Sequence, residues 1–250
     1  MKVTILGSGT AEPSLTKNSS GLLIACESTL SLVDFGYGNL RQLLRLGVTY
    51  HDIDRIFFTH HHPDHMSDLL MFLFSAKYGQ TPRTRPLDIV AAPGFDQFFK
   101  RFTEAFRHWL IPEGYVIRLI AQDEETRDYG GLLVTSRRVR HIDLSRAYRF
   151  HDADGKILAV SGDTGYCPAM AELGKDADLL IIECSFPEEA NVDSHLTPRE
   201  AGRIAREAGA RKLCLTHLYP SLDPARALRE CADEFSGETV LAEDLMAFDL

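Results

Sequence analysis

The sequence predicts a protein of the α/β class, built as one domain over residues 1–250. Short apolar runs, typical of buried strands, alternate with segments of helical spacing in both halves of the chain. No linker, low-complexity tract or change of composition separates the two halves. Several apolar runs also stop at a histidine or an aspartate, so we expect chemically active side chains to gather at one edge of the sheets.

The composition is that of an ordinary globular protein. The chain has 250 residues, 44% hydrophobic and 25% charged, with a formal net charge of −9. That charge argues against broad contact with nucleic acid, although a local basic groove stays compatible with it. No apolar run approaches the ~20 residues of a membrane helix, and the first residues do not resemble a signal peptide. Five dispersed cysteines fit a reducing compartment, so we expect a cytoplasmic protein.

The first half of the chain predicts five strands and three helices. The expected strands cover residues 3–6, 22–26, 30–35, 55–59 and 87–91. The expected helices cover residues 40–46, 66–78 and 96–110. Leucines recur at helical spacing before Gly47, which suits the end of a helix. The helix at 96–110 carries an aromatic stripe, which we expect to pack in the core or in a dimer; a lid over a substrate cleft is the alternative.

The second half continues the alternation. The expected strands cover residues 132–139, 157–160, 179–182 and 212–216. Two helices are expected, one beginning after Thr197 and one over 224–235, before a last short strand or extended end. Thr197 and Glu200 have the spacing of a capping box, Pro198 suits the first helical position, and Gly209 suits the end of that helix.

The most informative stretch is Thr59-His60-His61-His62-Pro63-Asp64-His65, directly after the buried-strand pattern at 56–58. Imidazole nitrogens and a carboxylate oxygen suit zinc and similar divalent ions. A solvated histidine-rich turn is the alternative interpretation. Other apolar strands stop near His141, Asp163 and His217. We therefore expect these strand ends to form one shared metal site.

These residues resemble the metallo-β-lactamase superfamily. His60-x-His62-x-Asp64-His65 matches the HxHxDH signature, and the later ligand-type residues fall in that superfamily's order and approximate spacing. Within it, the chain is similar to the ribonuclease Z-like and phosphodiesterase branch. The segments that carry this likeness are Gly7-Ser8-Gly9-Thr10, Val33-Asp34-Phe35-Gly36, Glu183-Cys184-Ser185-Phe186, His195-Leu196-Thr197 and Leu215-Thr216-His217. The resemblance covers nearly the whole chain and implies a four-layer αββα sandwich with a two-metal site at one edge.

The resemblance also implies roles for the site residues. The implied ligands are His60, His62 and His141 for one divalent ion, Asp64, His65 and His217 for the other, and Asp163 as the bridge between them. Asp64 would also orient the nucleophile, and His195 would donate a proton to the departing oxygen. A polar residue beside a helix cap is the alternative interpretation of His195. His61, between two ligands, should point away from the ions.

A dinuclear site of this kind predicts a metal-dependent hydrolase. Two ions about 3.5–4 Å apart can hold a bridging hydroxide as the nucleophile and stabilise the charge that develops during hydrolysis. The imidazole-rich set favours zinc, with manganese as the alternative, over a redox di-iron site. The flavodiiron branch of the superfamily differs, since it carries an acidic residue at the second position of the signature.

The loops around the site favour a small phosphodiester substrate. Ribonuclease Z enzymes grip transfer RNA with a protruding arm, which in the bacterial form lies between the counterparts of His141 and Asp163. Here only 21 residues separate those two positions, and Leu218-Tyr219-Pro220-Ser221 departs from the aromatic-serine pattern of that branch. We therefore favour a small or cyclic phosphodiester. The alternatives are a ribonuclease Z-like RNA endonuclease, a lactonase or thioesterase, and a non-catalytic metal-binding module. We also allow for a homodimer and expect no association with a membrane.

Overall fold

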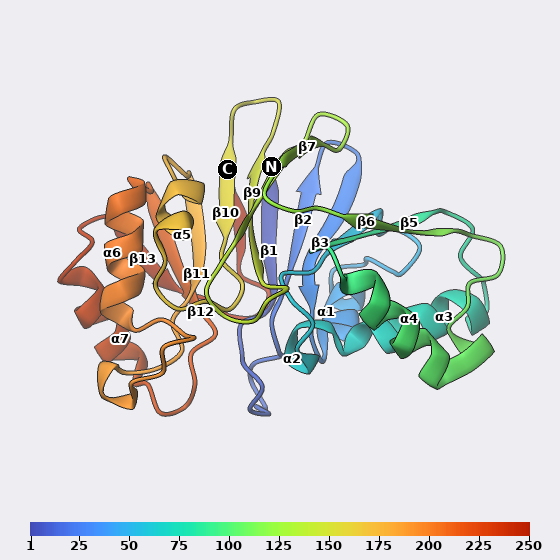
Figure 1. Ribbon diagram of the computed structural model, residues 1–250, viewed down its shortest axis with the longest axis horizontal. Helices are drawn as coiled ribbons and strands as arrows, with labels where there is room; N and C mark the ends of the chain where they lie inside the picture. Colours follow the sequence, from blue (N-terminus) through green and yellow to red (C-terminus); the bar gives the residue numbers. More distant parts are fainter.

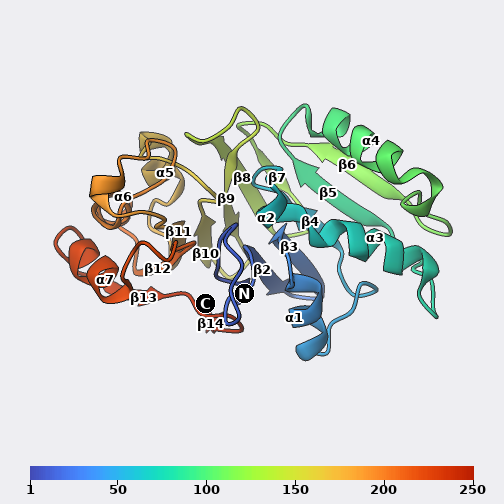
Figure 2. The same ribbon diagram turned by 90° about the horizontal axis from the view of Figure 1, so that it is seen from below.

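The computed structural model describes residues 1–250 and arranges them in four layers (Figures 1 and 2). Two seven-stranded sheets lie face to face. Their strand orders are β14-β1-β2-β3-β4-β5-β6 and β13-β12-β11-β10-β9-β8-β7. Figure 2 shows α1, α3 and α4 outside the first sheet, and α5, α6 and α7 outside the second. The predicted αββα sandwich is confirmed.

The first sheet comes from the N-terminal half of the chain and from its last strand. Its strands are β1 (Lys2–Gly7), β2 (Gly21–Cys26), β3 (Thr29–Phe35), β4 (Arg55–Phe57), β5 (Leu87–Ala91), β6 (Ile117–Ala121) and β14 (Ala247–Asp249). The helices beside it are α1 (Asn39–Arg45), α2 (Pro63–Met66), α3 (Asp68–Tyr78) and α4 (Phe95–Phe106), which continues into the short 3-10 helix η1 (Arg107–Trp109). Strands β3 to β6 are parallel, so their carboxyl ends lie at the same edge.

The second sheet comes from the rest of the chain. Its strands are β7 (Thr126–Asp128), β8 (Leu133–Arg138), β9 (Arg146–His151), β10 (Ile157–Val160), β11 (Leu179–Glu183), β12 (Lys212–Thr216) and β13 (Glu238–Leu241). The helical segments beside it are α5 (Pro168–Leu173), η2 (Glu188–Ala190), α6 (Pro198–Ala208) and α7 (Pro224–Ala232). Strands β10 to β13 are parallel, and β8 runs in the same direction because β9 is antiparallel to both of its neighbours.

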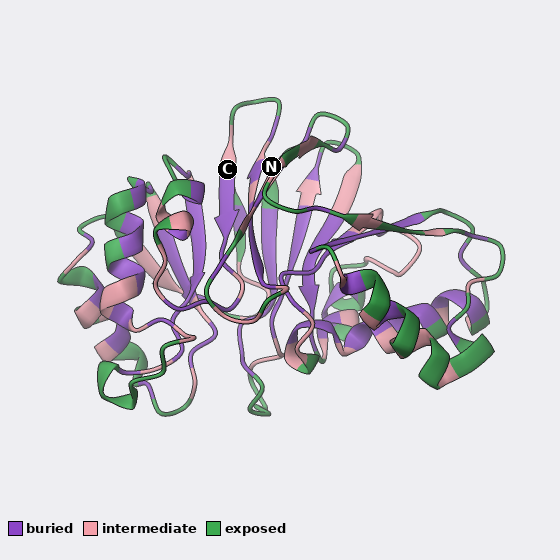
Figure 3. Ribbon diagram, in the orientation of Figure 1, coloured by how far each residue is buried: buried purple, intermediate pink, exposed green.

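Burial on both faces explains why the central strands are continuous apolar runs. Phe57 packs between the two sheets, whereas its neighbours Ile56 and Phe58 pack under the helices of the first layer. In β11, Ile181 likewise lies between the sheets and Ile182 lies under α5 and α6. Figure 3 shows these strands buried while the helices expose only their outer sides. A sheet covered on both faces has no polar side, so its strands do not alternate in polarity.

The helix signals agree with the structure in two places. At α6, the Thr197 hydroxyl accepts a hydrogen bond from the backbone N–H of Glu200, and the Glu200 carboxylate accepts one from the backbone N–H of Thr197. This is the predicted capping box. Gly209 ends that helix and Gly47 follows α1, both with positive φ, which glycine adopts at no steric cost.

Two predicted helices have different boundaries. The helix expected at 66–78 is split at Ser67 into α2 and α3, so the end of the histidine stretch is itself helical. Pro63 starts α2, because its fixed φ suits the first helical position. The helix expected at 96–110 ends at Phe106, since Arg107 takes a positive φ. Of the aromatic stripe, Phe99 belongs to the core and Phe98, Phe102 and Phe106 pack against it, which confirms packing as their role, whereas Trp109 is 52% exposed.

Several short elements were not predicted. Strand β9 carries arginines on an otherwise apolar pattern, and both find acceptors: Arg146 donates to Asp123, and Arg149 donates to the carbonyl oxygen of Leu173. Strands β6 and β7 are exposed on several residues, and α5 has only six residues, too few to show a helical period. None of the helices has the length and apolarity needed to cross a membrane.

Candidate metal centre

The parallel strands bring all seven predicted ligands to one edge of the two sheets, beside α2 in Figure 1. The first sheet supplies the residues after β4 and those on α2. The second sheet supplies one ligand each after β8, β10 and β12. Close packing joins the two sides, since a Cβ on Gly162 would lie 2.5 Å from the Thr59 Cβ. A larger residue at 162 would therefore push the Asp163 turn away from the histidine stretch.

One group of ligand atoms comes from His60, His62, His141 and Asp163. The Nε2 atom of His141 lies 3.1 Å from Nδ1 of His62 and 3.9 Å from Oδ2 of Asp163. His60 Nε2 lies 3.8 Å from the same carboxylate oxygen. The four side chains therefore point their ligand atoms at a common volume.

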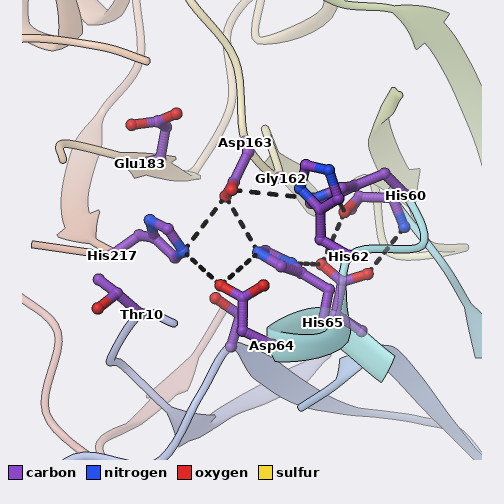
Figure 4. A network of polar contacts seen from close by, with 12 residues as sticks. Thr10, His60, His62, Asp64, His65, Gly162, Asp163, Glu183 and His217 are labelled. Carbon is purple, nitrogen blue, oxygen red and sulfur yellow. Dashed lines mark hydrogen bonds and ion pairs between the residues drawn. The ribbon is translucent and has the colours of Figure 1, made fainter. Parts of the chain in front are cut away.

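A second group comes from Asp64, His65, His217 and the same Asp163 (Figure 4). His65 Nε2 lies 3.2 Å from Oδ1 of Asp163 and 3.7 Å from Oδ2 of Asp64. His217 Nε2 lies 3.5 Å and 3.4 Å from the same two oxygens. Asp163 thus turns one oxygen toward each group, which is the geometry of a bridging carboxylate.

The residues present fit two divalent cations. His60 Nε2, His65 Nε2 and Asp163 Oδ1 are buried polar atoms without a hydrogen-bond partner. Buried polar atoms are rarely left unpaired, and here one belongs to the first ligand group (His60 Nε2) and two belong to the second (His65 Nε2 and Asp163 Oδ1). A donor set of imidazole and carboxylate is the one that zinc and similar ions bind.

Buried acceptors on the first-sheet side fix the tautomers of two histidines. The Asp34 carboxylate accepts hydrogen bonds from the Thr59 hydroxyl and from Nδ1 of His65, both at 2.8 Å. The Thr59 oxygen, having donated its proton to Asp34, accepts from Nδ1 of His60 at 3.0 Å. Both rings donate from Nδ1, so in the neutral form their Nε2 lone pairs face the site, as metal ligands require.

The second-sheet side repeats this arrangement. Nδ1 of His141 donates to the backbone carbonyl of Ser194 at 3.1 Å. Nδ1 of His217 donates to the Ser185 hydroxyl at 3.0 Å, and that hydroxyl donates onward to Glu183 at 2.6 Å. In their neutral form both rings therefore again turn a lone pair toward the site.

The electrostatics keep His60 and Asp163 in the states that bind a cation, whereas at His65 burial is outweighed by the carboxylates of Asp163 and Asp34, which raise the pKa of His65 well above its ordinary value. Burial, with the charge of His65 beside it, holds the pKa of His60 well below its ordinary value. Burial alone would raise the pKa of Asp163, but the neighbouring His217, His65 and His60 outweigh it and lower that pKa well below its usual range. A neutral imidazole and an ionised carboxylate are what a metal ion needs.

His195 lies beside the two groups and is held by Glu183. Its Nδ1 donates to Oε1 of Glu183 at 2.8 Å, and its ring centre lies 4.9 Å from that of His141. Glu183 is 1% exposed and also accepts hydrogen bonds from the backbone N–H groups of Thr164 and Leu196. Its carboxylate therefore fixes the ring of His195 so that Nε2 is the nitrogen left for other partners.

His61 does not join either group. Its ring contacts Phe98 of α4, with the ring centres 4.8 Å apart. The expectation that His61 points away from the ligand groups agrees with this placement.

Four supporting residues were missed as parts of the site: Asp34, Thr59, Glu183 and Ser185. The sequence carried a signal for two of them, because Asp34 and Glu183 are acidic residues near the end of apolar strands, as the ligands themselves are. Buried carboxylates need partners, so an acid in such a run indicates a buried histidine or arginine nearby. Which histidine it supports depends on the packing of the sheets.

The similarities to known proteins agree with this geometry. A family model described as "Beta-lactamase superfamily domain" matches residues 31–218. The chain is 30% identical to a protein named Ribonuclease Z from Myxococcus xanthus (strain DK1622), over 100% of this chain and 98% of that one. It is also 30% identical to a protein named Ribonuclease Z from Brevibacillus brevis, over 99% of this chain and 92% of that one.

Solved structures give the same result. The metallo-β-lactamase fold protein YhfI from Bacillus subtilis superposes with a TM-score of 0.85 at 27% identity, covering 99% of this chain and 98% of that one. The short form of human tRNase Z superposes with a TM-score of 0.78, also at 27% identity, covering 100% and 99%. The chain belongs to the metallo-β-lactamase superfamily, in its ribonuclease Z-like branch, and is a metal-dependent hydrolase.

Proposed function

We propose that this hydrolase cleaves phosphodiesters and holds two divalent metal ions, with zinc favoured by its imidazole-rich donor set. In this proposal His60, His62 and His141 hold one ion, Asp64, His65 and His217 hold the other, and Asp163 bridges them. The observation that carries the proposal is the position of His195, a half-buried histidine fixed by Glu183 at the side of two ligand groups that share one carboxylate. A proton donor beside such a pair suits cleavage of a bond whose leaving group is an alkoxide.

Bound divalent ions lower the pKa of a coordinated water and stabilise the charge that develops on phosphate. The side chains of the protein orient the attacking water and supply the proton for the leaving group. Burial would raise the pKa of Asp64, but the hydrogen bond with His217 and the charge of His65 outweigh it, and that pKa is lowered. Asp64 is therefore ionised near neutral pH and can accept a hydrogen bond from the attacking water, which orients it.

His195 serves the departing oxygen. Its Nδ1 proton is committed to Glu183, so only Nε2 is free to hold the proton that is transferred. Burial would lower the pKa of His195, but the hydrogen bond and the negative charge of Glu183 outweigh it, and that pKa is raised above its ordinary value. The protonated form that donation requires is thereby favoured.

Two observations favour a small phosphodiester, such as a cyclic nucleotide or a short nucleotide diester. The residues between His141 and Asp163 form only a short loop, β9, β10 and the turn between these strands. None is left to form a protruding arm that could hold transfer RNA. The alignment to the Myxococcus relative spans 303 positions against 250 residues here, so that relative carries residues that this chain lacks.

RNA is the second candidate substrate. Its support is the name Ribonuclease Z carried by relatives that match along almost their whole length. The catalytic side chains proposed above would serve an RNA phosphodiester equally well. The two candidates differ in what holds the substrate, and a comparison of substrates can separate them.

The test is a substrate panel on protein reconstituted with zinc or manganese: bis-p-nitrophenyl phosphate, cyclic nucleotides, a dinucleotide, precursor transfer RNA and lactones. We expect turnover of the small phosphodiesters and about two metal equivalents per chain by elemental analysis. Opening of lactones without cleavage of any phosphodiester would contradict the proposal. Cleavage of precursor transfer RNA alone would support the RNA candidate.

Replacing His195 by alanine is expected to lower turnover of a dinucleotide by about 10²–10⁴-fold, the usual contribution of a general acid. Metal content should not change, because His195 belongs to neither proposed ligand set. Steady-state kinetics and elemental analysis on the same preparation check both points. A matched control is His151→Ala, a partly exposed histidine at the end of β9. Loss of metal in the His195 variant would identify this residue as a ligand instead of a donor.

A further inference from the structure

Residues 188–195 lead from η2 to His195. Besides the contact of His195 with Glu183, this segment makes contacts with a second part of the site. On its other side it lies against the turn that carries His141. Its residues Glu188 to Asp193 are exposed, so few apolar contacts hold it in place. Leu196, directly after His195, is buried, so it is the residues before His195 that depend on a small number of polar and backbone contacts.

Three contacts join this segment to the second-sheet edge. The Ser194 carbonyl accepts the hydrogen bond from His141 already described. Nη2 of Arg140 lies 2.9 Å from Oδ2 of Asp193. The third contact is the close approach of the Asp193 carbonyl to Gly165, which is itself held by a hydrogen bond from its backbone N–H to the carbonyl of Arg140 at 2.8 Å. A Cβ built on Gly165 would lie 2.0 Å from the backbone oxygen of Asp193.

The Gly165 contact is a requirement for space and not for backbone conformation. Gly165 does not have a positive φ, so other residues could adopt its backbone. Only the absence of a side chain lets the Asp193 carbonyl, two residues before His195, come this close. Any larger residue forces the segment outward by roughly 1 Å, a displacement that in an active site can cost about 10²-fold in rate.

We propose that Gly165, assisted by the Arg140–Asp193 ion pair, is a positioning residue that holds His195 in place for proton donation. This inference rests on the proposed function, because it assumes that His195 donates to the leaving group. The two contributions differ in size. The ion pair is exposed, with Arg140 56% and Asp193 79% accessible, and such pairs contribute at most about 1 kcal/mol, or about fivefold in rate. The steric contact at Gly165 carries the larger share.

The inference predicts an effect that depends on the leaving group. p-Nitrophenolate departs without a proton, whereas the sugar alkoxide of a dinucleotide needs one. The Gly165→Ala enzyme should therefore lose about 10²-fold in kcat on a dinucleotide and less than about fivefold on bis-p-nitrophenyl phosphate, with its metal content retained. The matched control is Gly174→Ala. A Cβ at Gly174 would meet its nearest atoms at 3.3 Å, in a turn that alanine can adopt.

A second set of variants covers the case in which Gly165→Ala does not fold. Arg140→Ala, Asp193→Ala and the double variant should each lose about two- to fivefold on the dinucleotide alone. The double variant should lose no more than either single one, because the two side chains act as a pair. Equal losses on both substrates, or additive losses, would show that the pair does not position the donor.

The outcomes separate this inference from the proposed function. A wild-type enzyme that cleaves neither diester contradicts the proposed function itself. A His195→Ala enzyme that loses both activities equally contradicts the donor role. If the wild type and His195→Ala behave as expected while Gly165→Ala keeps the wild-type ratio of the two activities, the positioning role of Gly165 is wrong and the proposed function stands.

Discussion

Asp163→Asn protein is expected to lose its hydrolytic activity and to bind metal at least about 10²-fold more weakly, since even the partners of metal ligands cost 10–100-fold when replaced. Oδ1 of Asp163 faces His65 and His217, while Oδ2 faces His60 and His141. An asparagine keeps the size of the side chain but turns an N–H₂ donor toward one of these two groups. One group then meets a donor where it needs a negative charge.

Elemental analysis and turnover, measured on one preparation, check this prediction. Both proposed ions should be affected, because both groups share the carboxylate. Asp154→Asn is a matched control, since Asp154 is exposed in the turn between β9 and β10. Asp163→Asn protein with full metal content and wild-type turnover would show that the shared carboxylate is not a bridge.

The Glu183→Gln variant should retain its metal ions and lose about 10²–10⁴-fold in turnover of a substrate with an alkoxide leaving group. The neutral amide cannot accept all the hydrogen bonds that the carboxylate of Glu183 receives from His195, Ser185 and two backbone N–H groups. A buried donor left unpaired costs about 1–3 kcal/mol, so the variant should also unfold at lower urea concentration. Glu207→Gln, on the exposed face of α6, is the matched control.

The same variant gives a pH test. The pKa of His195 is raised because the hydrogen bond and charge of Glu183 outweigh the effect of burial. A proton donor acts in its protonated form, so activity falls as the pH rises through that pKa. Removing the charge of Glu183 lowers the pKa of His195, and the fall should then begin at lower pH. If activity falls over the same pH range in the variant as in the wild type, the role given to Glu183 is wrong.

The amino-acid sequence alone reveals the strands that are buried on both faces of a sheet. The apolar runs of β4 and β11 were predicted for this reason. Strand β9 was missed because Arg146 and Arg149 interrupt its apolar pattern. Their partners, a carboxylate and a carbonyl oxygen, lie 23 and 24 residues away along the chain, and only the folded structure brings them together.

The candidate site likewise contains residues that the sequence predicts and residues that only the folded structure identifies. Its seven ligand-type residues have a distinctive order and spacing, and each of the late ones follows an apolar strand. Asp34 and Glu183 also stand near the ends of apolar strands, but the histidine that each supports is set by contacts with His65, 31 residues away, and with His195, 12 residues away. Gly165 is still less visible, since its role is to leave a space that the Asp193 carbonyl fills.

The division of the ligands between the two sheets has a consequence for the order of folding. The N-terminal sheet provides four of them by His65, whereas the rest arrive with His141, Asp163 and His217. Neither the first four ligands nor the last three can enclose an ion alone, because each ligand group combines residues from both. During synthesis a nascent chain can complete either group only after strand β10 has docked, and the second group only after residue 217 has emerged. A tightly bound ion would then stabilise the contact between two halves of the protein that have formed at different times.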